Sequence, residues 1–358
     1  MLVFLTRLQA VDFWHDEKSS ALPFKSEKVT PVDMISIAAV GDVMMSSWII
    51  NLVEEYGYDF PFDSTASIIS SADLAIANLE APFTTSDSCH KDKTFTFKVP
   101  PYFLGGLLNA GFDIFTMANN HILDYGDEGL LQTMATLDSA GMPFCGAGEN
   151  VHKACAPKIV EKNGQKIAFA GFSMTFPKSF WAKTDRCGTC YPTLYRLRET
   201  MLAGEEQADI TIASFHWGQE KRTTPRDYQI EYAHRAIDYG ADLVLGHHPH
   251  VLQGFELYKG KLIAYSLGNY VFGSYSETAR TSAVLRALVR DDGLVYASVI
   301  PINVHNATVK FQPRLLKGLA RQTVIDSLNA YSQHLNLGKT LINRDGTIFP
   351  TLLVKNVP

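Results

Sequence analysis

Three histidines within four positions are the group of residues best able to carry chemistry in this sequence. They lie in the segment Gly246-His247-His248-Pro249-His250, which follows the apolar residues 241–245. Neutral imidazole is the commonest metal ligand in proteins, and an apolar run that ends in Gly and His is typical of a strand delivering ligands from its carboxyl end. His248 and His250 can reach one metal centre or two neighbouring ones. We expect His247 to point away, either supporting the ligands from behind or lying at the surface.

Four other short apolar runs also end in side chains that could bind a metal or transfer a proton. They end at Asp42, Glu80, Asn120-His121 and His216. Each residue has an ordinary alternative, because Asp often caps a helix, Asn is common in turns and a lone His is more often structural. Taken together as strand ends of one sheet, however, they converge on a single crevice. Two carboxylates, one Asn and four His suit a divalent metal such as Mn, Zn or Fe, or two ions about 3.5–4 Å apart.

Three further residues adjoin these strand ends. Asp124 could orient His121 or cap the following helix, and Glu220 follows His216 by four positions. Asn269 ends another apolar run in a Gly-Asn pair, where it could hydrogen-bond a ligand or simply form a turn. Cations near the site, such as Lys221, Arg222, Arg226 and Arg280, are usually solvated charges but could meet an anionic substrate.

Strands that alternate with helices are required to position these residues. Apolar runs predict strands at residues 34–40, 74–79, 114–118, 167–170, 210–215, 243–245 and 262–267. Helical spacing predicts helices at residues 102–110, 128–140, 195–207 and 228–239, with Gly111 and Gly240 as helix C-caps. This alternation predicts a layered α/β fold with helices on both faces.

The character of the chain changes after Ser274. Residues 282–290, 294–301 and 307–311 are strand-like, and Asp291-Asp292-Gly293 is a hairpin signal. We expect these strands to complete a second sheet. Residues 319–335 have helical spacing, so we predict a helical tail over residues 314–358 that packs on a main domain of residues 33–313.

The composition restricts the class of protein. The chain has 358 residues, 46% of them hydrophobic and 19% charged, which fits a globular protein. Its formal net charge of −5 gives no general attraction to nucleic acid, so an anionic substrate must be met by local cations or by metal. Residues 1–32 are interpreted as a polar leader. Its short apolar patch is interrupted by Arg7 and is not a full signal-peptide core, which predicts a cytoplasmic protein as written. The alternative is the remnant of a signal or anchor and a location outside the cytoplasm.

The five cysteines form no even framework. They include one CxxC segment, Cys187-Gly188-Thr189-Cys190, and no second CxxC that would complete a zinc site. We therefore expect Cys187 and Cys190 to form a loop disulfide or to remain two free thiols.

The chain resembles the CapA-type proteins of poly-γ-glutamate capsule synthesis, a branch of the calcineurin-like metallophosphatase superfamily. The matching segments are Gly41-Asp42-Val43-Met44, Asn78-Leu79-Glu80, residues 118–121, Asp124-Tyr125-Gly126, residues 216–220, residues 246–253 and residues 265–269. They span residues 35–275 in the order of the family. The resemblance implies a four-layer α/β/β/α sandwich of metallophosphatase type, with two mixed sheets flanked by helices and the site at one edge.

The resemblance also implies roles for the candidate residues. Asp42 and His250 would hold one metal, Asn120, His216 and His248 the other, and Glu80 would stand where the bridging Asp usually is. His121 would be the catalytic proton donor. Met44 occupies the place of the first motif's His, and Glu80 replaces an Asp. The site could therefore hold two metals, one or none.

Three functions follow as alternatives. The first is a metal-dependent hydrolase of a phosphoester or a γ-glutamyl polymer, with His121 and Asp124 as catalytic residues. The second is a non-catalytic polymer-binding or transport component of a capsule synthesis complex at the membrane, in which Glu220, Arg222 and Asn269 would contact substrate. The third is a degenerate fold kept as an interaction module, against which the intact His set argues, since clustered unpaired imidazoles are unusual without a ligand.

Overall fold

The computed structural model describes residues 34–290 and 293–350. These residues belong to a compact unit that runs from Asp33 to Pro358. The predicted leader, residues 1–32, and the last part of the predicted tail, residues 351–358, lie outside the described residues.

The first sheet contains the strand that carries Asp42 and the strands that precede Glu80 and Asn120. Its central strand β1 pairs in parallel with β2 and with β13, and antiparallel with β14. The sheet order is β16-β15-β14-β1-β2-β3-β4, with β17 added on β15. The bounds are β1 Ile35–Met44, β2 Leu74–Leu79, β3 Ile114–Thr116, β4 Phe144–Cys145, β13 Asn269–Phe272, β14 Thr281–Arg290, β15 Gly293–Asn303, β16 Arg314–Leu315 and β17 Thr347–Ile348.

The second sheet carries the histidines. Its order is β11-β12-β10-β9-β7-β6, and β7, β9, β10 and β12 run parallel. The bounds are β6 Lys158–Lys162, β7 Gln165–Ser173, β9 Ile210–His216, β10 Leu243–His247, β11 Phe255–Tyr258 and β12 Lys261–Ala264. A small ladder joins β5 (Ala147–Gly148) to β8 (Gly188–Thr189).

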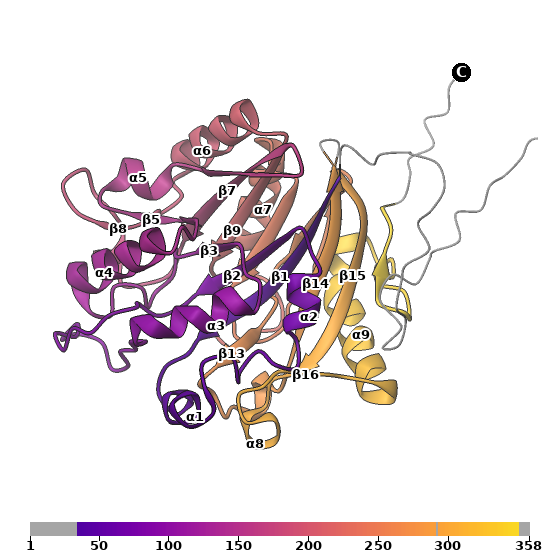
Figure 1. Cartoon of the computed structure of the whole chain (residues 1–358). Coiled ribbons are helices and arrows are strands. Elements are labelled where there is room, and N and C mark those ends of the chain that lie inside the picture. Colours follow the sequence, from indigo (N-terminus) through magenta and orange to yellow (C-terminus); the bar gives the residue numbers. More distant parts are fainter. Residues whose placement is uncertain (1–33, 291–292, 351–358) are drawn as a thin grey trace, which may run out of the picture. The chain divides into compact units, whose positions relative to one another are not determined.

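The two sheets pack face to face, with helices outside each of them (Figure 1). Along β1, Ile35, Ile37 and Ala39 face the second sheet, whereas Ala38 and Val40 face the outer helices. Successive side chains of a strand point to opposite faces, and here both faces of the strand are buried. Helices α1 (Ile49–Tyr56), α2 (Ala66–Ser70), α3 (Leu104–Asn109) and α4 (Gly126–Ser139) cover the first sheet, and α5 (Val151–Cys155), α6 (Leu194–Gln207) and α7 (Asp227–Asp238) cover the second. The predicted four-layer α/β/β/α sandwich is confirmed.

The last predicted helix also forms. Helix α9 spans Gly318–Ser332 and contacts β11 and β15. Its buried side chains Val324, Ile325 and Leu328 join the core between the sheets. The expected helix ends are confirmed as well, since Gly111 and Gly240 have φ of +90° and +108°.

Two sequence predictions about the later strands are wrong. The hairpin of β14 and β15 joins β1 in the first sheet instead of completing the second. Residues 307–311 do not form a strand, because a short helix α8 occupies Asn306–Val309. There the Asn306 side chain donates to the backbone oxygens of Phe272 and Ser274, and this bonding to the loop after β13 outweighs the strand propensity of the segment.

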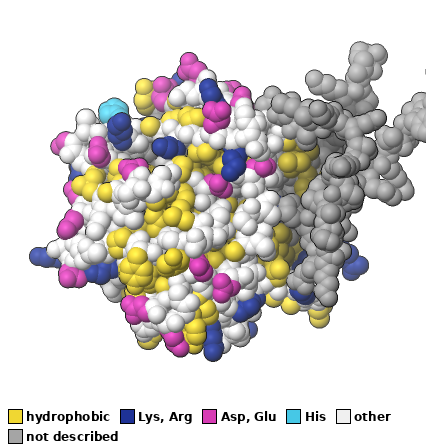
Figure 2. Space-filling view, viewed as in Figure 1, with side chains coloured by type: hydrophobic (Ala, Val, Ile, Leu, Met, Phe, Trp, Pro, Cys, Tyr) yellow, Lys and Arg dark blue, Asp and Glu magenta, His cyan; other side chains and the backbone are white. Residues whose placement is uncertain are grey.

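The face of the molecule shown in Figure 2 has no single charged field. On the face shown in Figure 2, acidic and basic side chains are interspersed. Within the described residues, no helix is both long and apolar enough to cross a membrane.

Candidate metal centre

The carboxyl ends of strands from both sheets bring the predicted metal ligands together. Three groups of donor atoms each lie within 4.8 Å of one another: Asp42, Glu80 and His250 form the first, Glu80, His216 and His248 the second, and Glu220, His248 and His250 the third. Glu80 belongs to the first two groups. The predicted convergence is therefore observed, but the strand ends come from two stacked sheets and not from one sheet.

Asp42 is held by histidines of the opposite sheet. Its Oδ2 lies 3.1 Å from His250 Nδ1, and its Oδ1 lies 3.3 Å from His247 Nδ1. Burial opposes ionisation, but the hydrogen bonds and charges of His247 and His250 outweigh it and hold the pKa of Asp42 well below its usual value. His247 is 1% exposed, so it lies behind Asp42 and not at the surface.

The remaining members of the centre are perturbed mainly by burial. Glu80 is fully buried, and this burial, together with the charge of Asp42, raises its pKa well above the usual range. Burial also lowers the pKa of His216, and it lowers that of His248 to about 3. His216 Nε2 lies 2.6 Å from Asn120 Oδ1 and 3.6 Å from Glu80 Oε1. The neutral imidazoles that a metal requires are therefore the favoured forms of His216 and His248.

Asn78 connects the two donor groups that share Glu80. Its Nδ2 donates to Asp42 Oδ1 at 2.8 Å and to Glu80 Oε2 at 3.1 Å, and lies 3.3 Å from His216 Nδ1. Asn119 in turn donates to Asn78 Oδ1. Asn78 faces Asp42 in the ladder between β1 and β2. No role for Asn78 is predicted from the sequence, because an Asn inside an apolar run is not part of a pattern from which its partners could be predicted.

The backbone of the histidine segment is strained. His248 and His250 have φ of +93° and +58°, in the left-handed region that side chains with a Cβ rarely adopt. Such conformations cluster at functional sites, where the surrounding structure enforces them. In this backbone conformation, the two imidazoles that flank Pro249 both belong to the candidate centre.

Two glycines allow the chains to approach at this edge. A Cβ on Gly41 would lie 1.8 Å from the backbone oxygen of Gly268, which accepts from the N–H of Asp42. A Cβ on Gly246 would lie 2.0 Å from the backbone oxygen of Tyr265. Only glycine fits at either position. Gly41 directly precedes Asp42 of the centre, and Gly246 directly precedes His247, which lies behind Asp42.

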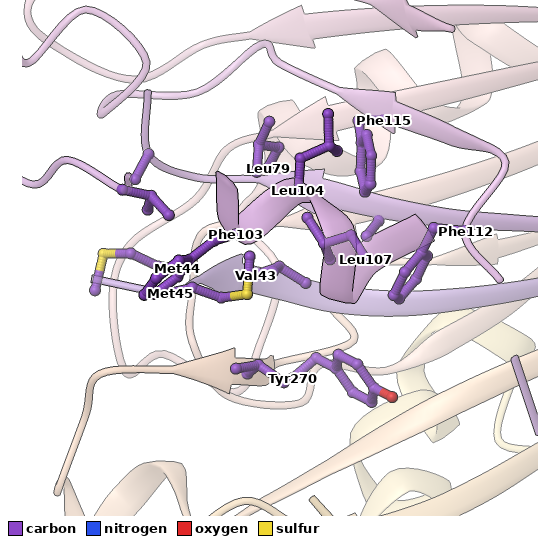
Figure 3. Packing of buried hydrophobic residues seen from close by; sticks show 14 of the residues in the cluster. Val43, Met44, Met45, Leu79, Phe103, Leu104, Leu107, Phe112, Phe115 and Tyr270 are labelled. Atoms are coloured by element: carbon purple, nitrogen blue, oxygen red, sulfur yellow. The ribbon is translucent and has the colours of Figure 1, made fainter. Parts of the chain in front are cut away.

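Strand β1 is irregular where it delivers Asp42. Its register with β2 shifts between Ala39 and Asp42, and its register with β13 shifts again between Asp42 and Met44. Met44 is 2% exposed and packs in the apolar cluster under the outer helices, as Figure 3 shows. The residue that takes the place of the first motif's His thus belongs to the core.

His121 is held by Asp124, one of the two roles considered for that residue, and by Lys93 and Phe97, which the sequence did not reveal. Its Nδ1 lies 2.7 Å from Asp124 Oδ2, and the backbone N–H of Phe97 donates to the same oxygen at 2.8 Å. Lys93 Nζ donates to Asp124 Oδ1 and to the backbone oxygen of Asn120. Burial lowers the pKa of both His121 and Lys93. With Nδ1 donating to Asp124, the Nε2 of His121 is left for another partner.

A cavity of about 750 Å³ opens beside the centre. It reaches Asn120 and His248, and both Glu220 and Arg226 line it. The exposed Arg222 donates through Nε to the backbone oxygen of Thr224. Asn269, another candidate substrate residue, lies with its Oδ1 3.0 Å from Nδ1 of the candidate ligand His250.

A disulfide lies next to this cavity. Cys190 pairs with Cys155, so the expected pairing of Cys187 with Cys190, or two free thiols, is wrong. Cys187 is a buried free thiol. The pairing follows from the fold, because the ladder between β5 and β8 brings the helix after β5 beside the segment after β8. Tyr191, the residue after Cys190, lines the cavity.

Comparisons with known proteins agree with this geometry. The profile of the family described as "Bacterial capsule synthesis protein PGA_cap" matches residues 36–274. The "Capsule biosynthesis protein CapA" of Bacillus anthracis is 30% identical over 298 residues, covering 80% of this chain and 72% of that protein. The "PGA biosynthesis protein CapA" of Bacillus subtilis (strain 168) is 32% identical over 298 residues, covering 83% and 78%.

Solved structures give more distant matches. The calcineurin-like phosphoesterase YfkN from Bacillus subtilis matches with a TM-score of 0.43 and 15% identity, covering 85% of this chain and 98% of that one. A 5'-nucleotidase precursor from Thermus thermophilus matches with a TM-score of 0.43 and 12% identity, covering 84% and 59%. The assignment therefore rests on the sequence comparisons, which place this chain in the family of bacterial capsule synthesis proteins described as PGA_cap.

Proposed function

We propose that this chain acts in the synthesis of a poly-γ-glutamate capsule as a metal-dependent hydrolase of a γ-glutamyl polymer or a phosphoester. The observation that carries the proposal is the pair of donor groups that share Glu80. Within the described residues, Glu80 Oε1, His248 Nδ1 and His247 Nε2 are buried without a hydrogen-bond partner. Buried polar atoms are rarely left in this state, so a ligand that they could bind is the simplest explanation.

The donor set fits one or two divalent ions of the Mn, Zn or Fe class. Asp42 and His250 would hold the first ion, Asn120, His216 and His248 the second, and Glu80 would contact both. In such a site a divalent metal supplies a Lewis acid and lowers the pKa of water toward neutrality.

His121 would assist at the leaving group. With Nδ1–H donating to Asp124, His121 as an imidazolium could give its Nε2 proton to the departing amine or alcohol as the bond to it breaks, and it would become the neutral imidazole. Lys93 and the Phe97 N–H keep Asp124 in place. His121 and Asp124 would be the catalytic pair, and Lys93 would position them.

The context of the reaction is proposed from the relatives and from the disulfide. The names of the two CapA relatives refer to capsule and PGA biosynthesis, so an anionic polymer, handled in a capsule synthesis complex at the membrane, is the substrate context that we propose. Disulfides persist in oxidising compartments, and the bond between Cys155 and Cys190 therefore favours a location outside the cytoplasm.

Metal analysis followed by activity assays tests this function. We expect the purified chain to bind one or two equivalents of Mn, Zn or Fe, and to cleave oligo-γ-glutamate or a phosphodiester only when loaded. His121→Ala should lower kcat by about 100-fold or more while metal is retained, and His248→Ala should lower metal content. A chain that binds no divalent metal, or whose turnover survives both substitutions, would contradict the hydrolase.

A non-catalytic role in polymer binding remains the second candidate because Met44 removes one donor from the first metal position. In that case the chain would bind oligo-γ-glutamate without cleaving it. A deletion strain complemented with His121→Ala separates the two roles. If the chain only binds the polymer, polymer length and yield should be restored; if it is the hydrolase, they should not.

A further inference from the structure

The cavity beside the metal centre has aromatic walls that are fixed in place. Tyr191 stacks on Trp181 with ring centroids 3.9 Å apart, and the disulfide of Cys190 holds the adjacent backbone. Tyr228 and Tyr232 of α7 line the cavity as well. Tyr228 accepts a hydrogen bond at 2.7 Å from the backbone N–H of Gly218, in the loop that follows His216. The cavity is therefore built from elements that also carry the centre.

One cation and one anion face this cavity without neutralising each other. Arg226 donates to the side chain of Gln219 and, among the described residues, has no carboxylate oxygen within 4.0 Å. In the described part of the chain, the Glu220 side chain makes no hydrogen bond or ion pair, and its carboxylate lies within 4.8 Å of ring nitrogens of His248 and His250. A guanidinium has five N–H donors, so Arg226 keeps donors for a ligand after its bond to Gln219.

We propose that this cavity binds the free amino-terminal residue of a γ-linked glutamate chain, with its α-carboxylate on Arg226 and its α-ammonium on Glu220. The inference rests on the proposed substrate class and specifies which part of the polymer enters the site. The tyrosine rings pack against the methylene groups of the residue. The next amide then extends toward Asn120 and His248, at the end of the cavity that meets the metal centre.

The charges discriminate the chain end from the interior. An internal γ-linked unit carries an α-carboxylate and a neutral amide, so it offers Arg226 a partner but leaves Glu220 facing a polyanion. Only the amino-terminal residue carries an ammonium and a carboxylate on the same carbon. Among the units of the polymer, this pair of opposite charges on the cavity is complementary to the amino-terminal residue alone, because unlike charges attract and like charges repel.

Binding of short glutamate chains by the full-length protein tests the inference. Calorimetry in EDTA, where metal-dependent turnover is absent, compares tri-γ-glutamate that has a free amino terminus with its N-acetylated form. We expect the free trimer to bind about tenfold tighter or more, as a charge-assisted contact predicts. Glu220→Gln should bind both forms equally, and Arg226→Gln should weaken both. Arg235→Gln, which alters an exposed arginine of α7 paired with Glu231, should bind as the unaltered chain does.

The outcomes separate this inference from the proposed hydrolase. Equal binding of the free and acetylated trimers, or discrimination that survives Glu220→Gln, would overturn it. Tighter binding of a nucleoside 5'-monophosphate than of the trimer would also overturn it, since the cavity would then select an aromatic phosphoester. The metal content of each variant is measured alongside. Failure to bind metal or to cleave substrate would refute the hydrolase and leave the recognition of the chain end standing.

Discussion

At the scale of single residues, Lys93 holds Asp124, the residue that orients His121. Its ammonium bonds to Asp124, whose side chain is fully buried. Removing one partner of a buried ion pair leaves the other charge uncompensated. Since the Phe97 N–H and His121 still contact Asp124, we expect Lys93→Met to lower the free energy of unfolding by about 2–3 kcal/mol in urea titrations.

Lys98→Met is the matched control for Lys93. Lys98 pairs with Asp87, whose side chain is 98% exposed, so its loss should cost under about 1 kcal/mol. Lys93→Arg should not restore the wild-type value fully, because the larger guanidinium cannot bond as a compact ammonium does. Equal costs for Lys93→Met and Lys98→Met would show that the buried pair has no special weight.

The place of Met44 leads to a prediction about the first metal position. Because this side chain packs in the core, Met44→His would bury an imidazole among apolar groups and would not add a ligand. We expect the bound metal per chain to stay unchanged by elemental analysis and the free energy of unfolding to fall by about 2–3 kcal/mol. Met44→Leu, which conserves volume, should cost under about 1.5 kcal/mol. A gain of one metal equivalent in Met44→His would contradict this account of β1.

At the scale of elements, the disulfide fastens the segment after β8 to helix α5. It closes a loop with a sequence separation of 35 residues, for which the chain-entropy estimate of its stabilisation is about 4 kcal/mol. We expect Cys155→Ser to lower the free energy of unfolding by about 2–4 kcal/mol, and a reducing agent to have the same effect on the unaltered chain. Cys89→Ser, at an exposed free thiol, is the control and should change little. A chain as stable reduced as oxidised would contradict the prediction.

The elements themselves could largely be predicted from the sequence, whereas their association could not. Strand β2 forms over the predicted residues 74–79, since a continuous apolar run bounded by turn residues has few alternatives. The candidate site residues stand out in the sequence because each polar side chain follows such a run. The partner of Cys190, the position of Lys93 in an irregular loop and the sheet that β14 joins all depend on contacts between distant segments. No local pattern specifies those contacts.

At the scale of the whole molecule, the candidate centre joins two sheets whose facing surfaces pack mainly through apolar side chains. Asp42 and Glu80 come from the first sheet, and His216, His248 and His250 come from the second. Ions that bind only the folded chain stabilise it by mass action, by about 2.7 kcal/mol at 100 times the dissociation constant. For a chain of this size that stabilisation corresponds to a rise in Tm of about 4 °C. We expect thermal denaturation in Mn²⁺ or Zn²⁺ to show this rise and EDTA to remove it.

Glu80→Gln tests whether the stabilisation depends on the shared carboxylate. Burial and the charge of Asp42 raise the pKa of Glu80, so the metal-free protein favours the protonated acid, which the amide matches in size and polarity. The variant should therefore keep its Tm in EDTA within about 2 °C and lose most of the rise on adding metal. Glu231→Gln, at an exposed residue of α7, should keep the full rise. A full metal-dependent rise in Glu80→Gln would mean that the two sheets are not joined through this residue.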